Sequence, residues 1–282
     1  MTARKFRFAP SPNGRLHLGH AYSALFTWRE ARRHDGLFLL RIEDIDTFRC
    51  KQEFVDGIFE DLSWLGLSWP EPARRQSKHL HEYITFIDRL ERLRLLYPCF
   101  CTRAKLNAVE GQRDPDGAPV YPGFCRLMTL WERQRRMTAG EPYALRLDMA
   151  KAIVAAGNNL TFREEGQGPA GETGLVACNP QAWGDVVLAR KDIGTSYHVA
   201  VVHDDALQGI THVTRGQDLF HATSVHRVLQ SILELPQPVY IHHGLIPDET
   251  GRKLSKSAGD RSLASLRDAG VTAEEVRREL GF

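Results

Sequence analysis

The sequence predicts an α/β protein built around a parallel β-sheet. Over the first hundred residues, short apolar strands alternate with amphipathic helices, and the same alternation returns after residue 197. Strands separated by helices of this length are joined by right-handed crossovers, which make the strands parallel and place ligands at their carboxyl ends. We therefore expect a ligand site at the carboxyl edge of this sheet.

The first half of the chain contains the clearest elements. Strands are expected at residues 5–9 and 37–42, and helices at residues 18–33 and 52–65. A third helix follows, and its apolar residues recur at helical spacing, which predicts that they face the core: Leu80, Tyr83, Ile84, Ile87, Leu90 and Leu93. Three tryptophans of this half are interpreted as packing residues: Trp28, Trp64 and Trp69.

The character of the sequence changes between residues 98 and 190. Stretches that contain glycine and proline, at residues 114–117 and 165–174, separate short strand-like pieces at residues 143–147 and 185–189. We therefore expect an inserted subdomain at residues 98–190.

The α/β pattern resumes from residue 197. It comprises an apolar run at residues 199–202, a strand at 210–214, a helix at 219–233 and a strand at 239–242. Residues 1–97 and 191–250 are thus predicted to form two halves of one core. Residues 251–282 are predicted to form a lysine-containing loop and a short helical segment.

Composition limits the class of protein. The chain has 282 residues, 37 Lys+Arg against 35 Asp+Glu, and 42% hydrophobic residues, which is typical of a globular protein. It has no apolar run near the length of about 20 residues that crosses a bilayer. The N-terminus lacks the apolar stretch of a secretory signal, so we expect a cytoplasmic location. Five cysteines in a reducing compartment favour a metal site over disulfides.

The first chemical motif spans residues 8–20, where a strand breaks into a loop with proline and glycine and then opens a helix. His17 and His20 would lie on the same side of the first helical turn, near backbone N–H groups and the positive end of the helix dipole, where phosphate binds favourably. Gly14 and Gly19 would let the backbone approach a nucleotide closely. Taken alone, the motif also fits a simple turn with two surface histidines.

The second motif is the small-residue loop at residues 251–258, which contains Lys253 and Lys256. Such a loop is suited to closing over a polyphosphate whose charge grows as the bond to the α-phosphorus breaks. Taken alone, a run of lysine and serine is more typical of a solvated loop.

Together, the His17-Leu18-Gly19-His20 motif and the lysine loop resemble the two signatures of class I aminoacyl-tRNA synthetases. Segments at residues 8–14, 40–46, 64–67, 201–205 and 209–218 look like the catalytic core of glutamyl-tRNA synthetases. Leu18 and Leu254 stand where the family often has isoleucine and methionine, and both are conservative apolar changes. The resemblance implies a Rossmann-type parallel sheet with an inserted zinc-bearing subdomain and a short C-terminal helical segment.

Only residues 258–282 follow the lysine loop, too few for the anticodon-binding region of that family. A core of this type with a zinc-type insert resembles its tRNA-modifying branch, the glutamyl-Q tRNA(Asp) synthetases. The resemblance implies that ATP activates L-glutamate to glutamyl-adenylate, and that glutamate is then transferred to the queuosine in the anticodon of tRNA(Asp). Alternatives are a minimal glutamyl-tRNA synthetase that charges a tRNA 3′ end, a small-molecule nucleotidyltransferase, and a non-catalytic tRNA-binding relic. A monomer without membrane contact is expected.

The resemblance also implies site residues. ATP, with Mg²⁺ bridging its phosphates, would be bound by His17, Gly19, His20 and Lys256, and the catalytic set would be His17, His20, Lys253 and Lys256. A dicarboxylic amino acid needs cations for its carboxylates, of which arginine is the best, and an anion for its ammonium group. By resemblance, the glutamate site comprises Arg7, Phe8, Ala9, Pro10, Ser11, Glu43, Tyr197 and Arg215. On residue type alone, Arg7, Glu43 and Arg215 are more typical of surface charges.

Three of the five cysteines, Cys99, Cys101 and Cys125, lie in one short stretch of the expected insert. Three thiolates and a fourth ligand suit a closed, structural, tetrahedral zinc site with one ion per chain. Small buried thiols without a metal are the alternative. Tyr121 is included as the fourth ligand on the resemblance alone.

The remaining cysteines and one histidine pair are interpreted without a metal. Cys50 and Cys178 have no cysteine neighbours in the sequence and are interpreted as packing residues. His242 and His243 are adjacent on an expected strand, so their side chains should point to opposite faces and should not share a metal.

Overall fold

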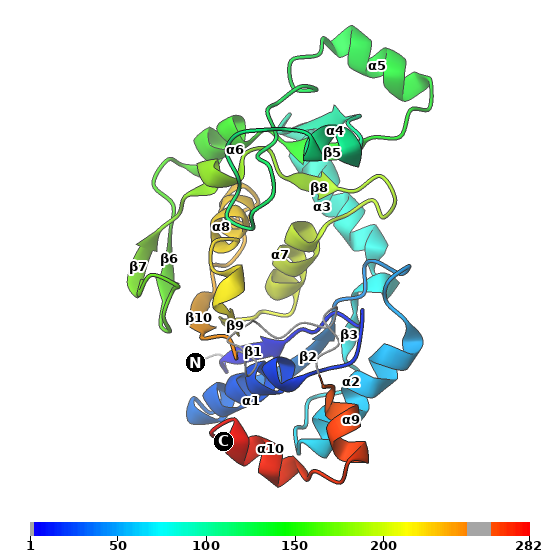
Figure 1. Ribbon diagram of the computed structural model, residues 1–282. Helices are drawn as coiled ribbons and strands as arrows, with labels where there is room; N and C mark the ends of the chain where they lie inside the picture. Colours follow the sequence, from blue (N-terminus) through cyan, green and yellow to red (C-terminus); the bar gives the residue numbers. More distant parts are fainter. Residues whose placement is uncertain (1–2, 247–260) are drawn as a thin grey trace.

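The computed structural model describes residues 3–246 and 261–282, and its centre is a mostly parallel sheet (Figure 1). The strands are β1 (Lys5–Phe8), β2 (Leu37–Ile42), β3 (Arg74–Arg75), β6 (Thr161–Glu164), β7 (Gly174–Ala177), β9 (His212–Gly216) and β10 (Val239–His243). Within the described residues they form a seven-stranded sheet in the order β3-β2-β1-β9-β10-β6-β7. Every pair is parallel except β6 with β7. The predicted parallel α/β fold is confirmed.

Helices cover both faces of this sheet (Figure 1). They are α1 (Leu18–Arg33), α2 (Gln52–Trp64), α3 (Leu80–Arg92), α6 (Met149–Ala156), α7 (Tyr197–Leu207) and α8 (Thr223–Ile232). One apolar core joins α1 and α2 to β1 and β2, and a second joins α3, α6, α7 and α8. Trp28, Trp64 and Trp69 pack against the first core, as predicted.

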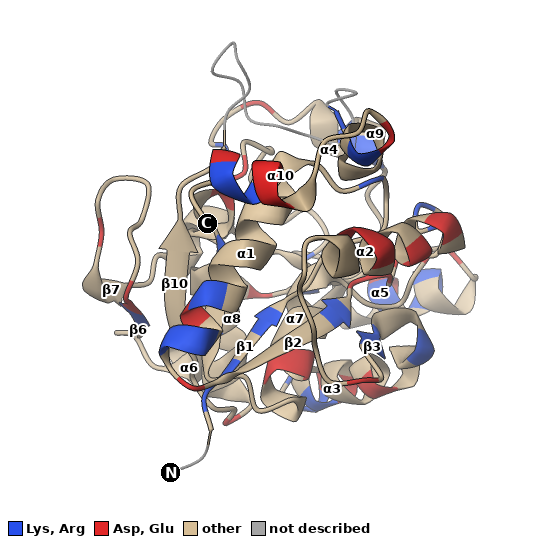
Figure 2. Ribbon diagram, turned by 90° about the horizontal axis from the view of Figure 1, so that it is seen from below, with Lys and Arg blue, Asp and Glu red and all other residues tan. Residues whose placement is uncertain are grey.

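Buried arginines interrupt this apolar interior. Figure 2 shows basic residues within β1 and β2, and Arg7 of β1 and Arg41 of β2 are buried. An arginine is rarely buried unless its charge is paired. These two arginines therefore indicate that acidic or polar partner groups lie next to the sheet.

A smaller antiparallel sheet lies at the far end of α3 and α7 (Figure 1). It comprises β4 (Leu96–Cys99), β5 (Ala144–Leu147) and β8 (Val187–Ala189), in that order, and is accompanied by α4 (Arg103–Asn107) and α5 (Leu130–Thr138). The strands expected at residues 143–147 and 185–189 are thus present in shortened form.

The range predicted as an insert, 98–190, does not stay within this smaller sheet. Its strands β6 and β7 extend the main sheet, because Glu164 of β6 is paired in parallel with Tyr240 of β10. The division of the chain at residues 97 and 190 remains a prediction. The sequence analysis did not identify β6 and β7, which are only four residues long each.

Some expectations from periodicity need correction. The strand expected at 210–214 is shifted to His212–Gly216, and the helix expected from residue 219 begins only at Thr223 after a 3-10 turn. The apolar run at residues 199–202, to which no element was assigned, lies inside helix α7. Ile84 and Leu93, predicted to be in the core, are 52% exposed. Helix α3 buries only one narrow face, which contains Tyr83, Ile87 and Leu90, and Leu93 caps its C-terminal end.

The described C-terminal residues form two short helices, α9 (Leu263–Asp268) and α10 (Ala273–Glu279). Leu263, Leu266 and Val276 join the core of α1 and α2, and Arg267 Nη1 lies 3.0 Å from Asp61 Oδ1. The short C-terminal helical segment is therefore confirmed for residues 261–282, whereas residues 251–260 lie outside the described part. No helix among the described residues is long and apolar enough to cross a bilayer.

Candidate active site

A cavity of about 950 Å³ lies at the carboxyl ends of β1, β9 and β10. Every residue predicted to bind glutamate or ATP that the structure describes lines this cavity: Arg7, Phe8, Ala9, Pro10, Ser11, His17, Gly19, His20, Glu43, Tyr197 and Arg215. Lys253 and Lys256 lie outside the described residues. The structure thus brings the predicted site together where parallel sheets usually bind ligands, and the roles of the single residues stay predictions.

The two histidines lie at the start of α1, where they cap the helix. His17 is the N-cap residue, its Nδ1 accepts a hydrogen bond from the Gly19 N–H at 3.1 Å, and His20 Nδ1 accepts one from the His17 N–H at 3.3 Å. The two ring centroids are 3.8 Å apart, so both rings lie on one side of the turn, as predicted. Because each Nδ1 is an acceptor, the neutral rings carry their proton on Nε2, which can donate to a phosphate oxygen.

Gly19 contributes to this turn by its lack of a side chain. A Cβ atom at this position would lie 3.1 Å from Cε1 of His17, which is tighter than an ordinary contact. Glycine therefore lets His17 fold back over the first turn of the helix.

Arg7 is paired with a carboxylate that the sequence analysis assigned no role. Arg7 Nε donates to Asp205 Oδ1 at 3.1 Å, and Arg41 Nη1 donates to the same oxygen at 2.7 Å. Burial alone would raise the pKa of Asp205, but the charges and hydrogen bonds of the two arginines outweigh burial and lower it. The segment at residues 201–205 was noticed only for its family resemblance, and its pattern does not show which acid meets Arg7.

Glu43 lies just beyond β2 and accepts hydrogen bonds from Arg41, with Nη2 at 3.0 Å. Burial raises its pKa, although the charges of Arg41 and Arg7 act in the opposite direction. Because Glu43 lines the cavity, a cation such as an ammonium group can reach its carboxyl group and would favour the ionised form.

Arg215 extends from β9 and is held by neutral groups. Its Nε donates to His242 Nε2 at 3.0 Å, its Nη2 donates to Thr223 Oγ1 at 2.6 Å, and its Nη1 lies 3.3 Å from His226 Nδ1. Tyr197, at the start of α7, packs its ring 5.6 Å from the ring of His226. Burial raises the pKa of Tyr197, so its hydroxyl stays protonated and can donate a hydrogen bond.

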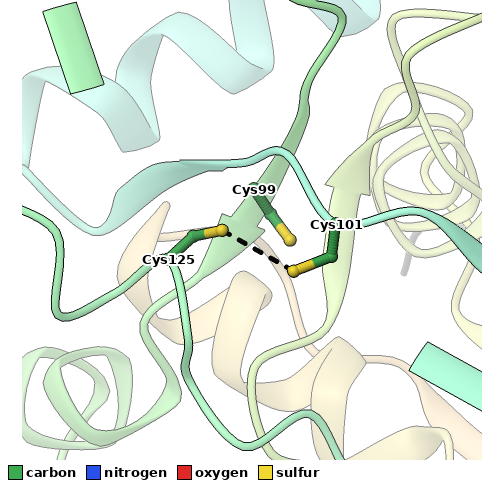
Figure 3. A group of neighbouring side chains, drawn as sticks. All are labelled: Cys99, Cys101 and Cys125. Atoms are coloured by element: carbon green, nitrogen blue, oxygen red, sulfur yellow. Dashed lines mark hydrogen bonds between the residues drawn. The ribbon is translucent and has the colours of Figure 1, made fainter. Parts of the chain in front are cut away.

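The predicted cysteine cluster forms away from this cavity. Cys99 lies at the end of β4, and Cys101 and Cys125 lie on loops, with the three Sγ atoms within 4.8 Å of one another (Figure 3). Cys101 Sγ is 3.7 Å from Cys125 Sγ and 3.8 Å from the hydroxyl oxygen of Tyr121. The structure therefore gathers all four predicted ligands at one point.

The thiols of this cluster differ in acidity. Burial opposes ionisation of Cys99, but hydrogen bonds from Tyr121, the Cys101 N–H and Arg146 lower its pKa. Burial and the neighbouring thiols raise the pKa of Cys101 to about 11.

The model of the family described as class I tRNA synthetases (E and Q), catalytic domain, matches residues 4–281 of this chain. The chain belongs to this family. It is therefore a ligase of the aminoacyl-tRNA synthetase class, and the resemblance stated from its motifs is confirmed.

Relatives in the synthetase family match this chain over nearly its whole length. A glutamyl-Q tRNA(Asp) synthetase of Rhodobacter capsulatus is 45% identical over 98% of this chain and 99% of the relative. One of Nitratidesulfovibrio vulgaris is 38% identical over 96% of this chain and 83% of the relative. A glutamate–tRNA ligase of Aquifex aeolicus is 37% identical, but this chain covers only 56% of it.

A solved structure of the family supports the fold. The glutamate tRNA ligase from Elizabethkingia meningosepticum, in complex with its amino acid, superposes with a TM-score of 0.73 and 27% identity over 91% of this chain. This synthetase chain spans about half of that ligase, since it covers 52% of its length.

Proposed function

We propose that this synthetase activates L-glutamate with ATP and transfers it to the queuosine of tRNA(Asp). The observation that carries the activation step is the arrangement of Arg7, Glu43 and Arg215 around the same cavity as the His17–His20 turn. Two cations and one carboxylate complement the two carboxylates and the ammonium group of glutamate. The choice of tRNA(Asp) as the acceptor is supported by relatives that this chain covers over most of their length and that are named glutamyl-Q tRNA(Asp) synthetases.

Activation requires the α-carboxylate of glutamate to attack the α-phosphorus of ATP in line with the departing pyrophosphate. This step needs positioning and charge stabilisation, not a covalent nucleophile. The first turn of α1 and the Nε2–H groups of His17 and His20 donate to the phosphate oxygens. Lys256 is the proposed main contact of the phosphates, with Lys253 in support, and both residues lie outside the described part of the chain. Mg²⁺, when bound, would neutralise part of the phosphate charge.

Transfer then uses the mixed anhydride of glutamyl-adenylate. A hydroxyl of the queuosine cyclopentenediol attacks the glutamyl carbonyl carbon and loses its proton, the new ester bond forms, and AMP leaves with the bond electrons. Within the cavity, Glu43 on the ammonium group and an arginine on the side-chain carboxylate keep the glutamyl group in place during this step, since these two groups of the substrate take no part in the bond that breaks.

We also propose that the cysteine cluster holds one structural zinc ion. The donor set supports this assignment, because three sulfur atoms and a phenolic oxygen surround one point and thiolates are preferred zinc ligands. Cys99, Cys101, Cys125 and Tyr121 would fill all four positions. The ion would tie the loop at Tyr121 and Cys125 to the end of β4.

The acceptor is tested with labelled glutamate and ATP on three RNAs: tRNA(Asp) with queuosine, the same tRNA without queuosine, and tRNA(Glu). We expect label on the first alone. Label on tRNA(Glu) would instead identify a minimal glutamyl-tRNA synthetase. Glutamate-dependent ATP–pyrophosphate exchange separates activation from transfer, and its absence from the wild-type protein would leave a non-catalytic RNA-binding protein. In the same assay Lys256→Ala should lose exchange while the protein stays folded.

A further inference from the structure

Three neighbouring strands each place one charged or titratable side chain in a row behind the cavity. Arg215 of β9 is in register with His242 of β10, and Glu164 lies at the end of β6, the next strand of the sheet. Arg215 Nε donates to His242 Nε2 at 3.0 Å, and His242 Nδ1 lies 2.5 Å from Glu164 Oε2. All three residues are at most 5% exposed, so they are buried.

The direction of these hydrogen bonds follows from the chemistry of arginine. A guanidinium group can only donate, so His242 Nε2 must be an acceptor and the ring proton must be on Nδ1. That proton is donated to Glu164, which also accepts the His242 N–H at 2.9 Å and the Gly166 N–H at 2.8 Å. Glu164 therefore balances the charge of Arg215 across a neutral imidazole instead of by direct contact.

Gly166 shows how closely the backbone is packed around this row. A Cβ atom at this position would lie 2.3 Å from the carbonyl oxygen of His242, a distance at which the backbone must move. Only glycine allows the residues after β6 to run against β10 and direct an N–H group at Glu164. The row is thus held by the packing of two strands.

This arrangement leaves the terminal nitrogens of Arg215 partly unused. Of the five N–H groups of a guanidinium, one is used by His242, one by Thr223 and one by His226. Among the described residues, no carboxylate forms an ion pair with Arg215. One N–H on each Nη atom has no acceptor among the described residues, and Arg215 lines the cavity. Two N–H groups are the number that a carboxylate accepts in a bidentate pair.

We propose that Glu164 and His242 are positioning residues that hold Arg215 for a carboxylate of the amino-acid substrate. The proposal rests on the proposed glutamate site, and it goes further because it makes β6 a determinant of glutamate affinity. Direct pairing of Arg215 with Glu164 would occupy the donors that the substrate needs. With the neutral imidazole between them, Glu164 supplies the compensating charge from a distance and leaves those donors available.

The test compares Glu164→Gln with Glu165→Gln, a matched change at an exposed residue that pairs with Arg163. Glutamate-dependent ATP–pyrophosphate exchange is measured for both. In E164Q we expect the KM for glutamate to rise about tenfold or more, because hydrogen bonding to a buried charged group is lost. The KM for ATP and kcat should stay within about twofold. E165Q should match the wild type, and equal glutamate KM values in the two variants would overturn the proposal.

Substitutions of His242 separate positioning from packing. His242→Gln keeps a side-chain carbonyl oxygen for Arg215 and an N–H for Glu164, whereas His242→Leu keeps neither. We expect glutamate KM within about threefold of the wild type for H242Q, and a rise of about tenfold or more for H242L. An equal rise in both variants would mean that the ring acts through its shape, which contradicts the proposal. If E164Q does not fold, the comparison of H242Q with H242L still tests the proposal.

Nitrogen NMR of the His242 ring tests the row without any substrate. The Nδ1-protonated tautomer is expected at neutral pH, and the Nε2-protonated tautomer would overturn the proposal. If the wild-type protein shows no glutamate-dependent exchange, the proposed function fails. The tautomer of His242 then still tests whether Arg215, His242 and Glu164 are hydrogen-bonded as proposed.

Discussion

The two sides of the cavity hold their arginines in different ways. On the β1 side, Arg7 and Arg41 share the carboxylate of Asp205 directly. On the β9 side, Arg215 contacts two imidazoles and a hydroxyl, and its nearest carboxylate in this row, Glu164, lies behind His242. Direct pairing balances the charge of an arginine within the protein, whereas hydrogen bonds to neutral groups hold the arginine without a carboxylate in contact with it. The difference indicates that Asp205 supports the fold and that the charge of Arg215 can be met by the carboxylate of a ligand.

The largest effect on stability is expected from the β1 side. Asp205→Asn would leave Arg7 and Arg41 without their shared charge, and breaking a buried ion pair costs about 3–5 kcal/mol. Urea unfolding measures the loss. Asp192→Asn is the control, since Asp192 forms an exposed pair with Arg190 that contributes about 1 kcal/mol or less. A loss in D205N no greater than in D192N would contradict the comparison.

The β9 side should show its effect in substrate affinity. Arg215→Met removes a cation that no described carboxylate pairs with directly, so we expect kcat/KM for glutamate to fall by about a hundredfold or more. Arg227→Met is a matched control, because Arg227 is also buried but does not line the cavity. Exchange kinetics at varied glutamate concentration measure both variants. If R227M loses as much glutamate affinity as R215M, Arg215 has no special role.

The two sides should also respond to acid in different pH ranges. Burial and the charge of Arg215 lower the pKa of His198 from 6.5 to about 4, and burial is the main cause that lowers the pKa of His242 from 6.5 to about 4. Neutral histidines therefore contribute stability that is complete above about pH 6.5 and is lost as the pH falls toward 4. Asp205 has a lowered pKa, so its contribution is lost only below its usual value of 3.8.

We therefore expect the free energy of unfolding to decrease between pH 6.5 and pH 4, with the histidines of the β9 side as a cause. His242→Gln should make this decrease shallower, because an amide does not titrate. Urea unfolding at several pH values measures it. An unchanged slope in H242Q would show that His242 is not buried in its neutral form.

The smallest effect on the cavity is expected from the cysteine cluster. Cys99→Ser should lose about one zinc ion per chain, while glutamate KM in the exchange assay stays unchanged, because none of the cysteines lines the cavity. Metal analysis of freshly purified protein measures the first outcome. Wild-type protein without zinc would remove the metal assignment, and a raised glutamate KM in C99S would link the two sites.

Local patterns predicted the elements next to the His17–His20 motif well. The helix expected at residues 18–33 and the strand expected at 37–42 have those bounds in the structure, because a helix start with a capping residue and an apolar period are properties of neighbouring residues. His242 and His243 point to opposite faces, as predicted: the first meets Glu164 and the second lies 3.1 Å from Ser23 Oγ. Periodicity was less informative for Ile84 and Leu93, since it cannot show how wide the buried face of a helix is.

The sequence by itself predicted the parallel α/β fold and indicated the three cysteines that meet in one cluster, because both follow from local periodicity and from residues that lie close together in the chain. It indicated Arg7, Glu43, Tyr197 and Arg215, which line the cavity, only through the resemblance to a known family. Only the tertiary structure decided that Asp205 pairs with Arg7, that β6 lies beside β10, and that Glu164 supports Arg215 through His242. The physical reason is that such partners are chosen by strand order and packing between segments far apart in the chain, which no local pattern encodes.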